Sequence, residues 1–326
     1  MSDDFNSVVG LDLKPVQSSN QPLPKIAVCL AAFNGREWLR EQLDSILVQK
    51  NVVVTVFVSV DRSNDGTEFW VNEFSKIDKR VIQLPQGFQF GGAAANFFRL
   101  LNDVYFAAFD YVSLADQDDV WYPDKLWRAV MSLSESGSDC YSSNVLAFWD
   151  DGKERLIDKA QSQTDLDFLF EAAGPGCTYV LKRAVVEDFK LLLVSHSSEI
   201  AKVGLHDWFI YAFARSRGYH WIIDPRPSMA YRQHAFNQVG VNAGWRAYLA
   251  RAKKIVGGWG IAQARLIVLL TGLESDPFCK PWRRPGRLGM LWLALNAYRA
   301  RRKVSDRFIF AAACLLLAIV GDRSNE

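Results

Sequence analysis

The chain of 326 residues is 49% hydrophobic and 23% charged, which excludes a mostly disordered protein and leaves room for one large catalytic domain with an appendage. Lys and Arg exceed Asp and Glu by only two overall, but from Trp245 onward fifteen basic residues stand against five acids, a balance of +10 that leaves −8 for the preceding residues. This asymmetry predicts that the C-terminal part faces a polyanion, either nucleic acid or an anionic membrane leaflet.

The N-terminal residues and the cysteines narrow the class of protein further. Residues 1–24 are polar and lack the basic start and apolar run of a signal peptide, so we expect a disordered tail on a cytosolic protein. The five cysteines are scattered, and none forms a CxxC pair or stands at ligand spacing from a histidine. The sequence therefore predicts neither a disulfide framework nor a zinc site.

From Lys25 onward, short apolar runs alternate with helical periodicity, which predicts an α/β fold with a mostly parallel sheet covered by helices. Residues 25–32 are expected to form the first strand. Asn34 and Glu37 have the spacing of a capping box for a helix that reaches Leu47. The β-branched run over residues 52–60 predicts a strand that is buried on both faces.

The next elements lead to a cluster of acids. Turn formers at residues 61–67 precede a helix near residues 68–74, a strand at 81–84, a helix that ends near Leu101 and a strand at 111–115. Asp116-Gln-Asp-Asp119 then stands between that strand and a helix entered at Pro123. Ligands bind at this edge of open α/β sheets, so we expect the acidic loop to line a site.

Beyond Gly137 we expect strands at residues 145–148, 177–181 and 221–224 and a buried helix at 208–217. After Val241 the sequence predicts basic, aromatic-rich helices. The apolar run over residues 308–320 has 13 positions, fewer than the roughly 20 of a membrane span. The basic clusters at residues 283–287 and 299–303 favour helices lying in an anionic membrane interface, and a soluble helical cap or dimer interface is the alternative.

Carboxylates in the acidic loop point to phosphate and metal chemistry. Asp116 and Asp118 can reach a ribose and a hard divalent cation that bridges two phosphates, because oxygen ligands suit Mg²⁺ or Mn²⁺. Two alternatives remain open on these residues. The cluster is also typical of a solvated turn at a helix start, and Asp116 also fits the nucleophile of a haloacid-dehalogenase-type phosphatase.

Five short blocks of sequence stand in a fixed order along the chain. They are Ala32-Phe-Asn-Gly35, Asp61-Arg-Ser-Asn-Asp-Gly-Thr67, Leu114-Ala-Asp-Gln-Asp-Asp-Val-Trp121 with Pro123-Asp-Lys125, His206-Asp-Trp208, and Tyr231-Arg-Gln-His234 followed by Asn237 and Gly240. These blocks resemble family 2 glycosyltransferases, and their order is most similar to the rhamnosyltransferase-like branch. The resemblance covers about residues 25–241 and implies a glycosyltransferase A-type fold, with a Rossmann-like nucleotide half joined to an acceptor half. The chain would then divide into the tail 1–24, the catalytic domain 25–241 and a helical C-terminal region 242–326.

The resemblance also implies roles for individual residues. Ala32 and Asp61 would contact the nucleotide base, Asp116 the ribose, Asp118 with His234 the metal, and Asp207 would be the catalytic base. The possible supporting residues are Asp119, His206, Arg232, Gly176 and Cys177. The sequence also leaves purely structural roles open. Asp61 and Asp65 could cap the next helix, His206 could be a packing residue, and the Gly-Pro-Gly segment could be an ordinary loop.

The function implied by the resemblance is inverting transfer of a sugar from a nucleotide diphosphate donor, with dTDP-rhamnose as the best guess. The cofactor would be Mg²⁺ or Mn²⁺, and the acceptor a hydroxyl of a cell-surface glycan, O-antigen or lipid-linked saccharide. We expect a cytoplasmic protein, peripheral on the inner membrane, that does not act on nucleic acid. The alternatives are the phosphatase and a catalytically silent, membrane-associated interaction protein.

Overall fold

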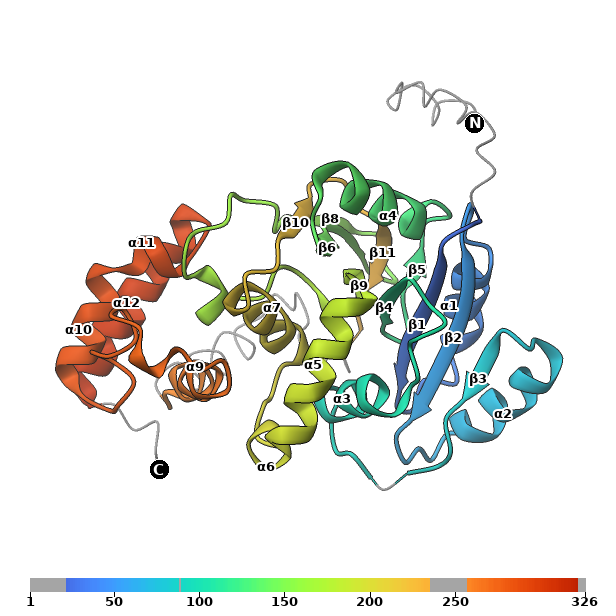
Figure 1. Ribbon diagram of the computed structural model, residues 1–326, viewed down its shortest axis with the longest axis horizontal. Helices are drawn as coiled ribbons and strands as arrows, with labels where there is room; N and C mark the ends of the chain where they lie inside the picture. The colour runs from blue at the N-terminus through green and yellow to red at the C-terminus, as the bar shows by residue number, and fades with distance from the viewer. Residues whose placement is uncertain (1–21, 88, 235–256, 322–326) are drawn as a thin grey trace.

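The computed structural model describes residues 22–87, 89–234 and 257–321, which form an α/β fold with one large and one small sheet (Figure 1). The strands are β1 (Lys25–Ala32), β2 (Val53–Val60), β3 (Val81–Gln83), β4 (Tyr111–Ala115), β5 (Val120–Trp121), β6 (Cys140–Ser143), β7 (Val145–Phe148), β8 (Glu154–Ile157), β9 (Val180–Lys182), β10 (Trp221–Asp224) and β11 (Met229–Arg232). The large sheet has the order β10-β6-β9-β4-β1-β2-β3, and the small sheet β5-β11-β7-β8. In the large sheet only the described pairings of β9 are antiparallel, which confirms the predicted fold class.

Helices cover both faces of the large sheet (Figure 1). The α-helices are α1 (Leu39–Leu47), α2 (Thr67–Ile77), α3 (Ala93–Asp103), α4 (Lys125–Ser136), α5 (Arg183–Ser195), α6 (Ser197–Ile200), α7 (His206–Ser216), α9 (Trp259–Leu270), α10 (Arg287–Leu295), α11 (Ala297–Ala300) and α12 (Val304–Val320). Short 3-10 helices are η1 (Asp167–Leu169), η2 (Gly176–Thr178) and η3 (Leu273–Ser275). The elements predicted from apolar periodicity are therefore present with bounds shifted by a few residues.

The central strand β1 shows why the sheet is buried on both sides. Successive side chains of a strand point to opposite faces, and every residue of β1 after Lys25 is buried. Ala27 and Cys29 belong to the core that includes α3, α5 and α7. Val28 and Leu30 belong to the second core, with α1 and α4. The carboxyl ends of the parallel strands thus hold their loops on a rigid two-sided base.

Two local predictions are wrong. Asn34 and Glu37 do not form a capping box, since α1 begins after Trp38 without a side-chain cap. Asn34 has a left-handed backbone (φ 47°), and its Oδ1 accepts a hydrogen bond from the backbone of Asn64 at 2.9 Å. Cys177 lies in η2, so the strand expected from residue 177 begins only at Val180.

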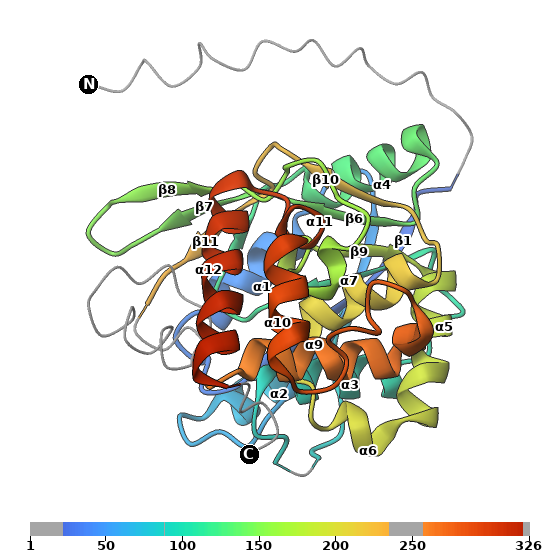
Figure 2. The same cartoon turned by 90° about the vertical axis from the view of Figure 1, so that its left-hand side faces the viewer.

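The C-terminal helices pack on the preceding α/β part of the chain. Buried side chains of α9, α10 and α12 belong to the same core as α3, α5 and α7. Figure 1 places α10 and α12 at one end of the molecule, and Figure 2, which views that end, shows them side by side. Within the described ranges, no helix is long and apolar enough to cross a membrane. The expected division after residue 241 lies in residues 235–256, outside the described part of the chain, as do Asn237 and Gly240.

A buried ionic network joins this C-terminal part to η1. Arg302, only 3% exposed, donates to Asp167 at 2.8 Å and lies 3.4 Å from Glu171. Tyr211 of α7 donates to the same Asp167 carboxylate at 2.8 Å. The neighbouring Arg299 pairs with Asp165 at 2.5 Å. Arg302 is therefore used inside the protein and Arg299 in an ion pair, which corrects the expectation that the basic cluster at residues 299–303 as a whole faces a membrane.

Replacing Arg302 with Met should lower the free energy of unfolding by about 3 kcal/mol, because it leaves the buried Asp167 carboxylate without its main counter-charge. Urea unfolding monitored by circular dichroism measures the change. The matched control is Arg299→Met, which removes a partly exposed ion pair and should cost less than about 1 kcal/mol. Equal effects of the two substitutions would show that the buried network does not stabilise the docking of the C-terminal helices.

Candidate active site

The acidic loop after β4 is attached to the loop after β1 by Gln117. Its side-chain amide donates to the carbonyl of Phe33 at 2.9 Å and accepts from the Phe33 amide at 2.8 Å. A Cβ at Gly35 would lie 2.1 Å from Gln117 Oε1, so only glycine fits beside this clamp. The clamp fixes the neighbouring Asp116 and Asp118 at the carboxyl edge of the sheet.

Pairing of β5 with β11 brings His234 to the acidic loop. Met229 and Ala230 lie opposite Trp121 and Val120 in antiparallel register, so the chain leaves β11 beside the acids. His234 Nε2 lies 2.7 Å from Asp118 Oδ2, and both side chains are 12% exposed. The structure therefore brings together the two side chains expected to hold a metal.

Trp38 holds the imidazole of His234 from the other side. The two rings stack with centroids 4.3 Å apart and an interplanar angle of 15°. Trp38 immediately precedes α1, whereas His234 follows β11, so residues almost 200 positions apart meet at this point. The stack restricts the ring orientation in which His234 faces Asp118.

Asp116 and Asp119 lie in a low-dielectric environment. Burial and the nearby Asp118 carboxylate raise the pKa of Asp116 to about 7, and a hydrogen bond from the Cys177 thiol opposes this shift. Burial, Asp118 and Asp116 hold the pKa of Asp119 well above its usual range. Asp119 is fully buried, and its Oδ2 has no hydrogen-bond partner among the described residues. An unpartnered buried carboxylate oxygen beside other carboxylates is suited to a cation.

Lys125 places a buried ammonium group beneath these carboxylates. The side chain is fully buried, donates to the carbonyl of Cys177 at 2.6 Å and lies 3.1 Å from the ring centre of Trp121. Burial lowers its pKa to about 7, against the opposing effect of Cys177, Asp119 and Asp116. Lys125 thus ties the helix after the acidic loop to the Gly-Pro-Gly-Cys turn.

That turn packs against the start of α7. A Cβ at Gly176 would lie 2.4 Å from His206 Nε2 and 3.2 Å from the Cβ of Asp207, so a side chain at residue 176 would push α7 away. His206 stacks on Phe97 with centroids 4.0 Å apart, and burial lowers its pKa to about 3. Its Nε2 has no partner among the described residues. His206 is therefore a neutral imidazole that packs between α3 and the turn, which agrees with the packing alternative.

Asp207 stands in the first turn of α7. Its Oδ1 accepts a hydrogen bond from the Trp208 amide at 2.7 Å, and Tyr179 donates to its backbone carbonyl at 3.2 Å. Burial raises the pKa of the Asp207 carboxyl to about 6. The Asp207 carboxylate is close enough to raise the pKa of Asp116 as well. The turn at Gly176 and Cys177 links the two segments, because Gly176 packs on Asp207 and the Cys177 thiol lies within 4.8 Å of ligand atoms of Asp116 and Asp119. The start of α7 is therefore adjacent to the acidic loop.

Asp61 occupies a different environment. It is 4% exposed, and its two oxygens accept hydrogen bonds from the amides of Phe90 and Gly91, each at 2.9 Å. Its own amide donates to the carbonyl of Ala32 at 2.8 Å. Asp61 thus orders the segment before α3 instead of capping α2, and the expected contacts of Asp61 and Ala32 with a base remain predictions.

Arg232 is held by acidic groups on two sides. Its side chain donates to Glu41 at 2.5 Å and to the backbone carbonyl of Asp118 at 2.9 Å, and its amide donates to Asp119 at 3.2 Å. The guanidinium also lies over the ring of Phe148, 4.7 Å from its centre. Arg232 therefore supports the acidic loop in this structure.

The donor atoms of the site fit a hard divalent cation. Ligand atoms of Asp116, Asp119 and Cys177 lie within 4.8 Å of one another, and the Asp118–His234 pair adds a carboxylate and an imidazole nitrogen. Carboxylates suit Mg²⁺ or Mn²⁺, and an imidazole suits Mn²⁺ better than Mg²⁺. Burial keeps the pKa of the Cys177 thiol well above its usual range, so this thiol stays protonated and is a poor ligand.

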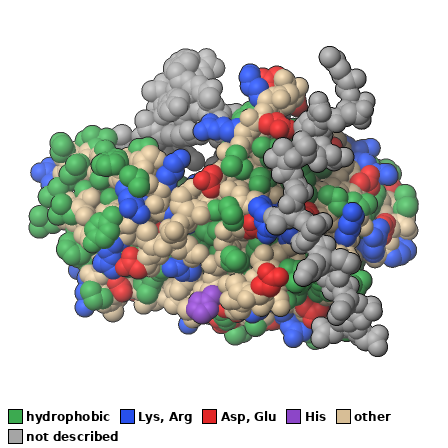
Figure 3. Space-filling view, turned by 90° about the horizontal axis from the view of Figure 1, so that it is seen from above, with side chains coloured by type: hydrophobic (Ala, Val, Ile, Leu, Met, Phe, Trp, Pro, Cys, Tyr) green, Lys and Arg blue, Asp and Glu red, His purple; other side chains and the backbone are tan. Residues whose placement is uncertain are grey.

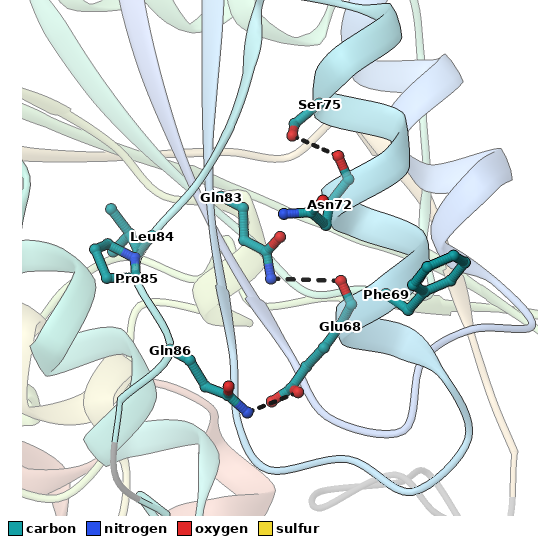
Figure 4. Close-up of a pocket in the computed structure, with 8 residues that line it drawn as sticks. All are labelled: Glu68, Phe69, Asn72, Ser75, Gln83, Leu84, Pro85 and Gln86. Carbon is teal, nitrogen blue, oxygen red and sulfur yellow. Dashed lines mark hydrogen bonds between the residues drawn. The ribbon is translucent and has the colours of Figure 1, made fainter.

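A separate pocket of about 480 Å³ lies between α2 and the segment after β3 (Figure 4). In it Gln86 donates to the carboxylate of Glu68 at 2.8 Å, and the Gln83 amide lies 3.5 Å from the Glu68 carbonyl. None of the residues predicted to carry the chemistry lines this pocket. The carboxylate site is therefore distinct from it.

Sequence reasoning gave no role to three residues that shape the site: Trp38, Gln117 and Lys125. Gln117 and Lys125 stand inside the acidic motif and its extension, so their positions in the motif were a usable signal. Trp38 has the helical spacing of a core residue, and nothing in the sequence indicates that it stacks on His234.

Comparison with known proteins agrees with this geometry. The family model "Glycosyl transferase family 2" matches residues 27–182. The dTDP-rhamnosyl transferase RfbG of Shigella flexneri is 42% identical over 291 residues, which cover 89% of this chain and 100% of that protein. A glucosyltransferase of Escherichia coli, WfgD, is 25% identical over 52% of this chain and 64% of its own length.

Solved structures share the fold at low sequence identity. TarS 1-349 of S. aureus superposes with a TM-score of 0.55 at 15% identity, over 90% of this chain and 81% of that one. The mannosyltransferase PcManGT of Pyrobaculum calidifontis, in complex with GDP-Man and Mn2+, superposes with a TM-score of 0.52 at 17% identity, over 92% of this chain and 87% of that one. The solved structures support the fold, and the 42% identical relative, matched over its whole length, together with the family model shows that the chain belongs to glycosyl transferase family 2.

Proposed function

We propose that this enzyme transfers L-rhamnose from dTDP-rhamnose, with inversion, to a hydroxyl group of a growing cell-surface polysaccharide such as an O-antigen. The identity of 42% to a dTDP-rhamnosyl transferase over that protein's whole length supports the donor. The observation that carries the proposal is that the start of α7, with Asp207, packs on the Gly176-Cys177 turn, while the Cys177 thiol lies within 4.8 Å of ligand atoms of Asp116 and Asp119. A carboxylate facing a cluster of cation ligands is the arrangement that a single displacement needs.

Asp118 and His234 would hold Mg²⁺ or Mn²⁺, with Asp119 supporting them through its unpartnered Oδ2. When bound, the cation neutralises the charge that builds up on the departing nucleoside diphosphate. Asp116 would bind the ribose, and Asp61 with the backbone of Ala32 would lie toward the base. Gln117 fixes these loops relative to each other by its two hydrogen bonds to Phe33.

Asp207 would accept the proton of the attacking hydroxyl group. Burial raises the pKa of its carboxyl to about 6, which makes it a stronger base than an exposed Asp while leaving it mostly ionised at neutral pH. Tyr179, through the backbone of Asp207, and Gly176, through its contact with α7, fix the position of this carboxylate. His206 and Cys177 pack around it, and Arg232 stabilises the acidic loop.

We further propose that the acceptor is a glycan or a lipid-linked saccharide and that the protein works at the cytoplasmic face of the inner membrane. The surplus of basic residues in the C-terminal part supports a location at an anionic surface. The phosphatase alternative is wrong because the chain belongs to a transferase family. A catalytically silent role has no support from the assembled carboxylates.

Incubating the purified protein with a panel of nucleotide sugars and a lipid-linked acceptor tests the proposal. We expect turnover with dTDP-rhamnose, at least about tenfold faster than with UDP-glucose or GDP-mannose, because a pocket matched to one sugar discriminates by a kcal/mol or more. EDTA should abolish the turnover, and Mn²⁺ or Mg²⁺ should restore it. Equal rates with all donors would refute the donor assignment, and full activity in EDTA would refute the metal.

A further inference from the structure

The helices α10, α11 and α12 expose an apolar surface at one end of the molecule. We define the apolar end face by six exposed side chains: Leu288, Leu295 and Tyr298 on α10 and α11, and Phe308, Leu315 and Ile319 on α12. Leu288, Leu295, Phe308 and Ile319 are each more than 70% exposed. Figure 3 shows hydrophobic side chains gathered over this end of the molecule.

The exposed residues recur at helical spacing, so they form stripes and not a scatter. On α10 and α11 the spacings are seven and three residues, and on α12 they are seven and four. The opposite sides of the same helices are buried, since Met290 and Leu293 of α10 and Leu317 of α12 belong to the core. The helices are therefore fully packed on their inner sides and present a second apolar side outward. Surfaces of this kind mark interaction sites.

The charge around the apolar end face is strongly positive. Residues 280–321 contain nine Lys and Arg and one Asp, a balance of +8. Some of these cations are used internally, as Arg302 is, but Arg284, Arg287 and Lys303 are exposed. Arg284 and Arg287 lie at the start of α10, and Lys303 directly precedes α12. The apolar stripes thus end in cationic side chains.

This charge decides which occupant fits the surface. A second copy of the chain docked through the same face would bring two cationic rims together, which is unfavourable at close range. An anionic lipid surface accepts both features, because the apolar side chains enter the boundary of the acyl chains while Lys and Arg contact the headgroups. We propose that the apolar end face docks the enzyme on an anionic membrane, with α10 and α12 lying in its plane.

The inference rests on the proposed location of the enzyme at the membrane and names the surface responsible. A chain of hydrogen bonds connects the apolar end face to the helix that carries Asp207. Arg302, between α11 and α12, bonds Asp167, and Asp167 accepts a hydrogen bond from Tyr211 of α7. The same helix begins with His206 and Asp207. A membrane bound at the end face would therefore stand in a fixed relation to the catalytic carboxylate.

Co-flotation with vesicles tests this proposal on the full chain. Wild-type protein should float with vesicles of phosphatidylcholine mixed with phosphatidylglycerol and should bind pure phosphatidylcholine much more weakly. The variant Arg284→Gln, Arg287→Gln, Lys303→Gln should lower the partition coefficient on anionic vesicles by about a hundredfold. The variant Leu288→Ser, Leu295→Ser, Phe308→Ser should lower it at least about tenfold. A matched control replaces Phe69, Ile77 and Tyr105 with Ser, since these are equally exposed but lie outside the C-terminal helices.

The control should bind vesicles as the wild type does. Failure of the wild type to float, or unchanged binding by both end-face variants, would overturn the proposal. So would a dimer in sedimentation velocity that the serine variant converts to a monomer, because the face would then belong to a second copy. Hydrolysis of dTDP-rhamnose in solution, measured on the same proteins, separates this result from the donor assignment. A protein that does not bind vesicles can still hydrolyse dTDP-rhamnose, and a protein that binds vesicles can fail to hydrolyse it.

Discussion

Replacing Asp207 with Asn is expected to lower kcat by about 10²–10⁴-fold, the range for loss of a general base. The amide keeps the size of the carboxyl and its hydrogen bond from the Trp208 backbone but cannot accept the proton of the acceptor hydroxyl. Donor affinity should change less than about threefold, because in the proposed mechanism the Asp207 carboxylate would contact the acceptor hydroxyl and not the diphosphate. Single-turnover kinetics and calorimetric titration with dTDP-rhamnose measure the two quantities.

The pH profile provides a second readout for the same residue. Burial raises the pKa of Asp207 to about 6, and only the ionised carboxyl accepts a proton. Activity of the wild type should therefore rise with pH through about 6 and level off above it, and this limb should vanish in Asp207→Asn. The raised pKa also means that the ionised carboxyl destabilises the folded state at neutral pH, so the Asn variant should not have a lower Tm.

The control for Asp207→Asn is Asp188→Asn on α5, which removes a carboxylate that bonds Tyr219 outside the site. Its kcat should stay within about twofold of the wild type, as for surface substitutions away from the chemistry. Retention of full turnover by Asp207→Asn would assign the proton to another group. A fall in donor affinity equal to the fall in kcat would place Asp207 on the donor side instead.

Apolar periodicity predicted the strands and helices whose side chains form the hydrophobic core. β1, β4, β7 and β10 have the expected bounds, and β1 and β4 are almost wholly buried between the helices that cover the large sheet. The predicted capping box is absent because the Asn34 side chain accepts a hydrogen bond from the Asn64 amide in the neighbouring loop. A rule based on nearby residues cannot predict a partner 30 positions away. Local hydrogen-bonding rules are thus overridden where two loops at the sheet edge meet.

Contacts between distant segments of the chain also account for the parts of the site that the sequence did not predict. The resemblance to family 2 glycosyltransferases pointed to Asp118 and His234, but the stacking of Trp38 on His234 depends on how the segments before α1 and after β11 meet in space. The charge count of the C-terminal part was correct, yet it could not show that Arg302 is neutralised by Asp167, 135 positions earlier. Net charge describes the composition of a segment and does not show which charged side chains form ion pairs inside the folded protein.

Replacing Asp118 with Asn should remove most of the metal-dependent activity, with a loss in kcat/KM of about 10³, equivalent to about 4 kcal/mol. Asp118 is the carboxylate paired with His234 at 2.7 Å, and a neutral amide in its place weakens any cation site built on these two side chains. The affinity of the enzyme for Mn²⁺ in the presence of dTDP, measured by electron paramagnetic resonance, should fall in parallel.

Asp124→Asn is the matched control for Asp118→Asn, because Asp124 follows the acidic loop but has a half-exposed side chain and lies 3.9 Å from Arg128. It should keep wild-type Mn²⁺ affinity. His234→Gln should weaken Mn²⁺ binding without abolishing it, since Asp118 and Asp119 still supply oxygen ligands. If Asp118→Asn bound Mn²⁺ as tightly as the wild type, the short contact between Asp118 and His234 would be structural. The cation would then have to bind at Asp116 and Asp119, where an unpartnered carboxylate oxygen is already buried.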